Sequence, residues 1–322
     1  MNILHRGLIG LLAAGAAAIA CAQTYPSKPV RIVVSFAAGG GVDAMSRLVA
    51  LELQKQMGQT FFVENKPGAS GTIGADAVAK AAPDGYTILA GGNPELTFMP
   101  VVSEKLAYDA QRDIAPLVLA ANVPSVIVVH PGSGITSATQ LMERARAPNG
   151  LPYATPGRGT PMHLAFELLN AESGTRFIHV PYKGGGPATS DVLAGQVSVA
   201  VINAPPLMAH IRAGKLRALA IMQEERSALL PEVPTLREAA GINGILAPAW
   251  FAFSASAKVP PEILARLEKE LLRALADPEL KAKLAGAGLD IVALPAARMA
   301  QIIRSETAYN AATVKRLGFK PD

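Results

Sequence analysis

The chain has one cysteine among its 322 residues, Cys21, which lies close to the N-terminus. The residues beyond it therefore cannot form a disulfide with one another, a thiolate metal site or a cysteine nucleophile. Aromatic residues are also scarce at 5% and charged residues account for 17%, whereas 50% of the sequence is hydrophobic. This composition excludes intrinsic disorder and predicts a well-buried core, in one large α/β domain or in two domains.

Runs of basic residues are absent, although Lys and Arg outnumber Asp and Glu and give a formal net charge of +5. A protein that binds nucleic acid would concentrate its basic residues on one element. The charge is instead spread thinly along this chain, so we expect no nucleic-acid partner. The diffuse positive bias favours anionic small molecules.

A long apolar run occurs once, within residues 1–22, where the sequence has the organisation of a cleavable signal peptide. Residues 1–6 are short and basic, residues 7–20 are apolar, and residues 20–22 (Ala-Cys-Ala) offer a small-residue cleavage site. We therefore predict export, with the formal net charge falling from +5 to +4 because the leader holds one Arg and no acid. The alternatives are a membrane anchor, for which the run is short, and lipid attachment at Cys21.

The chain beyond the leader begins with alternating strand and helix patterns. Strands are predicted at 30–34, 60–64 and 86–90, and the first of these is a buried, β-branched run. Helices are predicted at 42–57 and 72–81, the former with apolar residues at helical spacing and Gly58 at its end. Repeated strand–loop–helix units predict an α/β domain with a parallel sheet.

The same pattern restarts in the middle of the sequence and gives way to a helical tail. The second set of predicted strands and helices comprises strands at 125–129, 177–180, 197–202 and 216–221 and helices at 139–147, 161–172 and 187–194. The tail is predicted to form helices at 261–276, 278–287 and 296–316. We therefore expect a second α/β unit with its own parallel sheet.

Two α/β units in series on an exported, cysteine-poor chain predict a two-lobed binding protein with a ligand cleft between the lobes. The expected division is a signal peptide at 1–22, a first lobe at 23–123, a second lobe at 124–242, and a mainly helical return to the first lobe at 243–322. The linkers between the lobes are expected near 121–124 and 241–250.

Four glycine-bearing loops, at 37–43, 65–74, 155–160 and 181–187, each lie between a predicted strand and a predicted helix. Open α/β sheets bind ligands at the carboxyl ends of their strands. Glycine lets a ligand approach the backbone there, and the following helix offers free N–H groups at the positive end of its dipole. One such loop is an ordinary turn, but four facing one cleft predict an anion site built from backbone donors.

A competing motif lies in the first loop. Gly39-x-Gly41-x-x-Ala44 satisfies the dinucleotide-binding fingerprint, and Glu64 follows at the distance of a ribose-binding acid. Asp43, however, would lie beside a pyrophosphate that it repels, and an exported protein meets little nucleotide. An oxidoreductase that uses this loop is therefore kept as the alternative function.

The remaining ionisable residues give no stronger case for catalysis. His130, His163, His179 and His210 include no pair at i, i+4, so no metal site is predicted. Ser70 lacks the G-x-S-x-G context of hydrolases, and no paired acids occur in an apolar setting. We expect a protein that is not an enzyme and that needs no cofactor and no metal.

Several segments closely resemble the extracytoplasmic solute receptors of tripartite tricarboxylate transporters, also called Bug-type receptors. They occur in the same order along essentially the whole chain after the leader. The segments are YPSKPV (25–30), GGGVD (39–43), VENKPGASG (63–71), APDGYT (82–87), HVPYKG (179–184), AGKLRALA (213–220) and PEVPT (231–235).

The resemblance implies a periplasmic, monomeric Venus-flytrap receptor, each lobe a mainly parallel sheet flanked by helices, that closes on a small organic acid and delivers it to a membrane permease. It implies that loops 37–43 and 68–74 hold one carboxylate through backbone groups and water, and that residues 155–160 and 182–187 read the rest of the ligand. The expected ligand-binding residues are Phe36, Ala38, Gly39, Gly40, Gly41, Val42, Asp43, Ala69, Ser70, Gly71, Thr72, Glu95, Thr155, Arg158, Gly159, Thr160, His163, Tyr182, Lys183, Gly184 and Asn203.

Four departures from the family pattern bear on the ligand. Val42 replaces a usual Thr, Arg158 a small polar residue or Asn, Ile202 an Asp, and Glu95-Leu96 a frequent Thr-His. They prevent any transfer of aspartate, glutamate or citrate specificity to this chain.

Arg158 is the most informative of these departures. A guanidinium in the cleft could bind a second carboxylate in bidentate fashion, which favours a dianionic ligand, but Arg158 could equally be a solvated surface residue. Glu95 points the other way, since it could receive an amine or a hydroxyl. The sequence leaves both a monocarboxylate and a dicarboxylate open.

Overall fold

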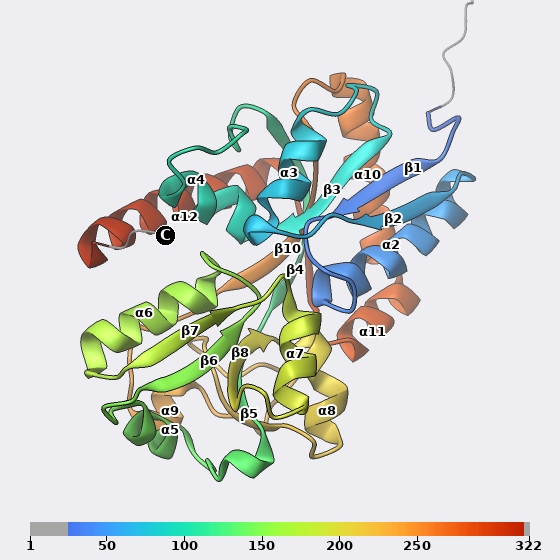
Figure 1. The fold of residues 1–322 in the computed structure, drawn as a ribbon. Coiled ribbons are helices and arrows are strands. Elements are labelled where there is room, and N and C mark those ends of the chain that lie inside the picture. The colour runs from blue at the N-terminus through green and yellow to red at the C-terminus, as the bar shows by residue number, and fades with distance from the viewer. Residues whose placement is uncertain (1–24, 319–322) are drawn as a thin grey trace, which may run out of the picture.

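The computed structural model describes residues 25–318, which form two lobes, each built on its own sheet (Figure 1). The predicted leader and Cys21 lie outside the described residues. The first sheet has the strand order β11-β4-β10-β3-β1-β2, with β1 (Val30–Val34), β2 (Phe61–Asn65), β3 (Thr87–Gly92), β4 (Ile114–Val123), β10 (Ala249–Ser256) and β11 (Asp290–Pro295). The second has the order β7-β6-β8-β5-β9, with β5 (Ser125–Val129), β6 (Leu151–Thr155), β7 (Phe177–Pro181), β8 (Val199–Asn203) and β9 (Arg217–Ile221).

Helices flank both sheets. Those packed with the first sheet are α2 (Gly41–Met57), α3 (Thr72–Ala79), α4 (Met99–Val102), α10 (Pro261–Ala276), α11 (Pro278–Gly286) and α12 (Ala296–Leu317), together with the short turns η1 (Ala69–Gly71) and η2 (Pro94–Phe98). The second lobe carries α5 (Ala138–Ala145), α6 (Pro161–Ser173), α7 (Gly185–Leu193), α8 (Met208–Arg212) and α9 (Leu236–Ala240), with η3 (Pro131–Ser133) and η4 (Pro205–Leu207). No helix within residues 25–318 is long and apolar enough to cross a membrane.

Each sheet is mainly parallel, with an antiparallel strand inside it. In the first sheet β2, β1, β3 and β4 share one direction, and β10 runs against β3 and β4. In the second, β5 runs against both β8 and β9. The prediction of a mainly parallel second sheet is confirmed, but it did not foresee the antiparallel direction of β5, and the prediction for the tail missed β10 and β11.

The hydrophobic pattern of β1 explains why helices cover both faces of the first sheet. Ile32 and Val34 pack in the core cluster that contains the apolar face of α2, including Met45 and Leu53. Val33 points to the opposite face and packs with the small residues of α3 and with α12. A strand covered on both faces is largely apolar, and four of the five residues of β1 are accordingly Val or Ile.

The two crossings between the lobes lie side by side. The chain passes directly from β4 to β5 at Pro124, and it returns through residues 222–248 into β10. Val123 and Ala249 are paired in the ladder between β4 and β10, so both crossings leave the first sheet at the same end of these two neighbouring strands. Hydrogen bonds from the Ser125 hydroxyl to the Ala247 carbonyl (2.7 Å) and from the Ala247 amide to the Met222 carbonyl (3.0 Å) tie the crossings together.

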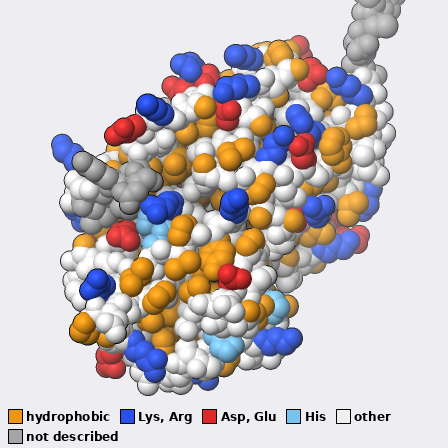
Figure 2. All heavy atoms as spheres, in the orientation of Figure 1, with side chains coloured by type: hydrophobic (Ala, Val, Ile, Leu, Met, Phe, Trp, Pro, Cys, Tyr) orange, Lys and Arg blue, Asp and Glu red, His pale blue; other side chains and the backbone are white. Residues whose placement is uncertain are grey.

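The lobes are in contact across the cleft that separates them. The Ala37 amide donates a hydrogen bond to the Lys183 carbonyl (3.1 Å), and the Ser70 hydroxyl donates one to the Arg158 carbonyl. At the far side, Phe98 from the first lobe packs against Leu164 of α6. The two lobes are therefore closed onto each other in this structure. Charged side chains are scattered over the face shown in Figure 2 and do not gather in a basic patch.

Candidate ligand cleft

Two neighbouring cavities lie between the lobes, and the first, here called the uncharged cavity, contains no ionisable side chain. It has an empty volume of about 500 Å³, part of which opens to solvent. The first lobe contributes residues from loops, from the start of α2 and from strands β3 and β10: Phe36, Gly40, Gly41, Val42, Gly92, Asn93, Pro94, Ala249 and Phe251. The second lobe contributes Pro156, Thr160, Pro161, Met162, Gly185, Ile202, Asn203 and Pro206.

Two helix N-termini meet at this cavity. Helices α2 and α7 begin at Gly41 and Gly185, and neither has a side-chain cap for its first amides. A Cβ placed on Gly40 would lie 3.8 Å from the amide nitrogens of both Gly185 and Gly186, so the two helix starts face each other across the cleft. Uncapped first-turn amides and two dipoles that point inward make this an anion-binding geometry.

Asn203, the last residue of β8, adds a side-chain donor to the same cavity. Its side chain is 9% exposed, and its Nδ2 atom is buried without a hydrogen-bond partner among the described residues. A buried donor that is left unpaired costs about 1–3 kcal/mol, and a ligand oxygen in the cavity would remove that cost. The orphaned amide therefore points to an acceptor that the closed cleft is built to receive.

Asp43 does not line the cavity, and instead it fixes the loop that precedes α2. Its carboxylate accepts hydrogen bonds from the Gly39 amide (3.1 Å), from Asn65 Nδ2 (3.0 Å) and from Arg47 Nε (3.1 Å). Burial alone would raise the pKa of Asp43, but the bonds from Arg47, Gly39 and Asn65 hold it below its usual value. The negative charge is thus neutralised within the first lobe, away from the anion-binding amides.

The second cavity, here called the cationic cavity, shares Phe36 and Pro156 with the first and has an empty volume of about 530 Å³. Its other lining residues are Gly68, Ala69, Ser70, Gly71, Gly157, Arg158, Pro181, Tyr182 and Lys183. Both cationic residues are exposed to solvent. The Tyr182 hydroxyl donates a hydrogen bond to Asp191 (2.7 Å), so it is committed to the second lobe.

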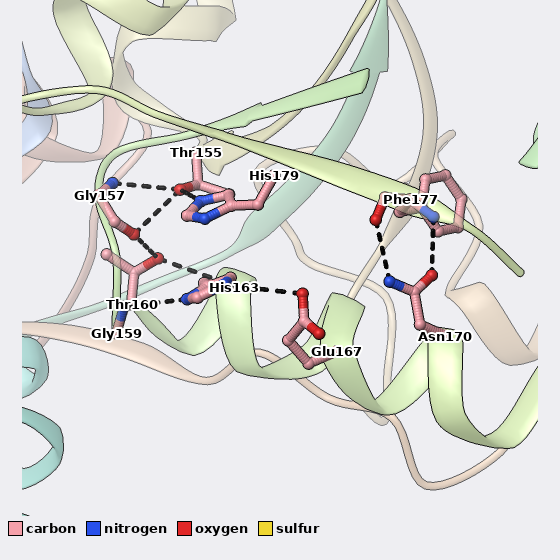
Figure 3. Close-up of polar contacts among 9 residues, drawn as sticks. All are labelled: Thr155, Gly157, Gly159, Thr160, His163, Glu167, Asn170, Phe177 and His179. Atoms are coloured by element: carbon pink, nitrogen blue, oxygen red, sulfur yellow. Dashed lines mark hydrogen bonds and ion pairs between the residues drawn. The ribbon is translucent and has the colours of Figure 1, made fainter. Parts of the chain in front are cut away.

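A pair of stacked histidines supports the 155–160 loop (Figure 3). Residues of this loop line both cavities, so the loop forms a wall between them. The rings of His163 and His179 are stacked with centroids 3.8 Å apart. His163 Nδ1 accepts a hydrogen bond from the Gly159 amide (3.1 Å), and His179 Nε2 lies 2.6 Å from the Thr155 hydroxyl.

Burial, followed by the charge of Arg158, lowers the pKa of His163 to about 4. Burial and the two neighbouring groups His163 and Arg158 lower that of His179 to about 3. Both rings are neutral at pH 7.

Glu95 is fully buried and lies behind the cleft. It accepts hydrogen bonds from the Ser35 hydroxyl (2.7 Å) and the Gly92 amide (2.9 Å). Its Oε2 faces Gly71, where an added Cβ would lie 2.7 Å away. Burial raises the pKa of Glu95 to about 7, although these hydrogen bonds oppose the rise. Glu95 lines neither cavity and supports the loop at Gly71 from behind.

The residues expected from the sequence divide into three groups. Those that line the uncharged cavity are Phe36, Gly40, Gly41, Val42, Thr160 and Asn203. Those that line the cationic cavity, besides Phe36, are Ala69, Ser70, Gly71, Arg158, Tyr182 and Lys183. Those that line neither cavity are Ala38, Gly39, Asp43, Thr72, Glu95, Thr155, Gly159, His163 and Gly184.

Several lining residues were not expected from the sequence. Phe251 lies on β10, which the tail prediction missed, and it approaches Gly41 so closely that a Cβ there would lie 2.7 Å from the ring. Asn93 and Pro94 follow β3 directly, so the rule that ligands bind at strand carboxyl ends could have found them. Met162 lies in the first turn of α6, beside the predicted 155–160 loop.

The loop that matches the dinucleotide fingerprint packs closely against the second lobe. A Cβ on Gly186 would lie 2.7 Å from the Ala38 carbonyl oxygen and 3.2 Å from the Gly39 carbonyl carbon. The closed cleft therefore has no space for a pyrophosphate beside these residues. Within residues 25–318, no group of three or more His, Cys, Asp or Glu side chains could hold a metal ion.

Comparisons with known proteins agree with this architecture. Residues 45–319 match the tripartite tricarboxylate transporter family receptor. BugT of Bordetella pertussis (strain Tohama I) is 35% identical over 318 residues, which cover 97% of this chain and 96% of BugT. The solved periplasmic binding protein BugD superimposes with a TM-score of 0.87 at 29% identity, and Rpa4515 of R. palustris with adipate does so with a TM-score of 0.88 at 31% identity. Each of these two alignments covers 92% of this chain and 100% of the other.

The two-lobed fold, the match over most of the sequence and the likeness to BugT over nearly the full length of both chains lead to one assignment. The chain belongs to the tripartite tricarboxylate transporter family of receptors and has the fold of a periplasmic binding protein.

Proposed function

We propose that this chain is a periplasmic receptor that captures a small organic acid in the uncharged cavity and delivers it to the permease of a tripartite tricarboxylate-type transporter. One observation carries the proposal. The buried, unpartnered Nδ2 of Asn203 and the uncapped starts of α2 and α7 converge on a single cavity between the lobes. Donors that lack acceptors favour a carboxylate, which accepts hydrogen bonds at both oxygens.

Family membership supports the other parts of the proposal. A related structure, Rpa4515, is described with adipate, a carboxylate. Export by residues 1–22 and life as a monomer in the periplasm fit a receptor that passes its ligand to a membrane permease. We further propose that the first lobe spans 23–123 and 243–322 and the second 124–242. Closure would then rotate the lobes about 121–124 and 241–250.

Titration calorimetry of the exported chain with a panel of C2–C8 carboxylates tests the proposal. We expect at least one carboxylate to bind with 1:1 stoichiometry. The variant Asn203→Ala should weaken that binding about tenfold to a hundredfold, because a hydrogen bond to a charged group is worth about 1.5–3 kcal/mol. Asn149→Ala removes an exposed Asn side chain that lines neither cavity and lies outside both proposed hinge segments, and it serves as the control.

Absence of binding across the whole panel, with the protein folded by circular dichroism, would overturn the proposed function. Binding that Asn203→Ala and Asn149→Ala weaken equally would show that the acid binds outside the uncharged cavity.

A further inference from the structure

The surface of the uncharged cavity is almost entirely apolar. Ten of its side chains carry no polar atom, namely Phe36, Val42, Pro94, Pro156, Pro161, Met162, Ile202, Pro206, Ala249 and Phe251. Val42, Met162 and Ile202 are each at most 4% exposed in the closed structure. Most of the surface that a ligand meets in this cavity is therefore hydrocarbon.

The few polar side chains of the cavity are, with one exception, already engaged. Asn93 Nδ2 donates to the Pro248 carbonyl (2.9 Å). The Thr160 hydroxyl donates to the Gly157 carbonyl (2.9 Å) and accepts a hydrogen bond from the His163 amide. Asn203 is the exception, with its unpartnered Nδ2. The cavity thus has hydrogen-bond donors for one polar group of a ligand, at Asn203 and at the starts of α2 and α7.

A second charge on the ligand would find no partner inside this cavity. A carboxylate that is removed from water without a counter-ion or hydrogen bonds is strongly disfavoured. The nearest cationic residues that line a cavity, Arg158 and Lys183, belong to the cationic cavity beyond Phe36 and Pro156.

From this arrangement we infer that the ligand is a compact monocarboxylate with an apolar body, a small aromatic or aliphatic acid. The inference rests on the proposed function and deepens it, since it concerns the same cavity. The carboxylate lies against Asn203 and the two helix starts, and the hydrocarbon body packs against Val42, Ile202 and Phe251. Burial of the hydrocarbon part of the ligand contributes binding free energy here. In a site for a dicarboxylate, the second carboxylate would make that contribution.

Calorimetry with matched pairs of acids tests the inference directly. Pentanoate and glutarate each have five carbons, and 4-methylbenzoate and terephthalate differ by a methyl group against a carboxylate. We expect the monocarboxylate of at least one pair to bind about tenfold or more tightly than its partner.

A near-isosteric variant locates the apolar contact. Val42→Thr, in the first turn of α2, replaces a methyl group with a hydroxyl and should weaken the apolar monocarboxylate several-fold. Val292→Thr makes the same replacement on β11, where neither Val292 nor its neighbours line either cavity, and should leave binding unchanged. Thermal unfolding of both variants checks that the fold is kept.

The outcomes separate the two proposals. If the dicarboxylate of each pair binds more tightly, the inference is wrong and the proposed function stands. An affinity that Val42→Thr raises would also overturn it, because the body then meets a polar surface. If no acid of either class binds, the proposed function fails and the inference fails with it.

Discussion

The uncharged cavity has no ionisable side chain, whereas the cationic cavity is lined by Arg158 and Lys183, although the two share Phe36 and Pro156. The donors of the uncharged cavity are main-chain amides and one buried side-chain amide, held in place by secondary structure. Those of the cationic cavity are flexible, exposed side chains. The two cavities therefore differ in the burial of their hydrogen-bond donors as well as in their charge.

This difference bears on how anions are recognised. Charges on exposed side chains are screened by water and salt, so they contribute little to binding. Fixed dipoles in a cavity with a mostly apolar surface act through a lower effective dielectric constant and need no reordering when the ligand arrives. We therefore expect the cavity without charges to bind the carboxylate, and the cavity with charges to attract it from solution.

The largest effect is expected when the lobes are kept apart, because the uncharged cavity exists only between them. In Gly186→Ala, the new Cβ would lie 2.7 Å from the Ala38 carbonyl oxygen of the other lobe. Over-packing of this kind costs about 1–3 kcal/mol, so ligand affinity should fall roughly fivefold to a hundredfold. Small-angle scattering with saturating ligand should show a larger radius of gyration than for the unmodified chain.

Gly286→Ala is the matched control, since nothing lies within 4 Å of a Cβ placed there on α11. It should leave both affinity and scattering unchanged. Unaltered ligand binding in Gly186→Ala would mean that the contact of α7 with the first loop is not needed for capture.

An intermediate effect is expected on acidification, through the wall that separates the cavities. The pKa of His163 is about 4 in the folded chain, below the ordinary value of 6.5, so the unfolded chain takes up the proton first as the pH falls. Stability should therefore be intact above pH 6.5 and decline between pH 6.5 and about 4. The part of this loss that comes from His163 should be about 3 kcal/mol, since one pKa unit is worth about 1.4 kcal/mol.

Urea unfolding at several pH values measures this decline, and His163→Asn isolates its source. The Asn side chain keeps an acceptor for the Gly159 amide but does not titrate. His179, Arg158 and Glu167, whose carboxylate lies 3.7 Å from His163 Nε2, are unchanged in the variant. An equally steep decline in His163→Asn would assign the pH dependence to groups other than His163.

The smallest effect is expected at the cationic cavity. Arg158→Ala should change the equilibrium affinity for an apolar monocarboxylate less than threefold and should reduce the association rate at low ionic strength. Stopped-flow binding at two salt concentrations measures both. If the variant instead weakens a dicarboxylate by about 1.5–3 kcal/mol and spares the matching monocarboxylate, Arg158 binds a second carboxylate and the two cavities act as one site.

Most helices and strands of the fold follow from local patterns, but the direction of the antiparallel strands does not. The runs at Val30–Val34 and Ser125–Val129 are β-branched and were predicted as strands. Strand β10, with the sequence AWFAFSAS, has no β-branched residue, and β11 ends in Pro295. The antiparallel direction of β5 and β10 is set by where the chain crosses between the lobes, which no local pattern encodes.

The same distinction applies to the site. The glycine loops could be predicted because a strand end, glycine and a helix start occur together in the sequence, as at Gly40 and Gly185. Phe251 could not, because it reaches the cavity from a strand more than 200 residues away from Gly41. Glu95 follows β3 closely but turns into the core, where Ser35 and Gly92 bind its carboxylate.

The use of main-chain amides at the starts of α2 and α7 has a consequence for how such a receptor can change over evolutionary time. A point mutation can replace any side chain, but it leaves the amide N–H in place unless it introduces proline. Substitutions at Val42 or Ile202 can therefore alter which hydrocarbon part of an acid fits the cavity, while the amides that bind the carboxylate remain in place. Receptors that descend from one gene could therefore acquire new ligand specificities by a few substitutions in the cavity wall, without first losing the capacity to bind an anion.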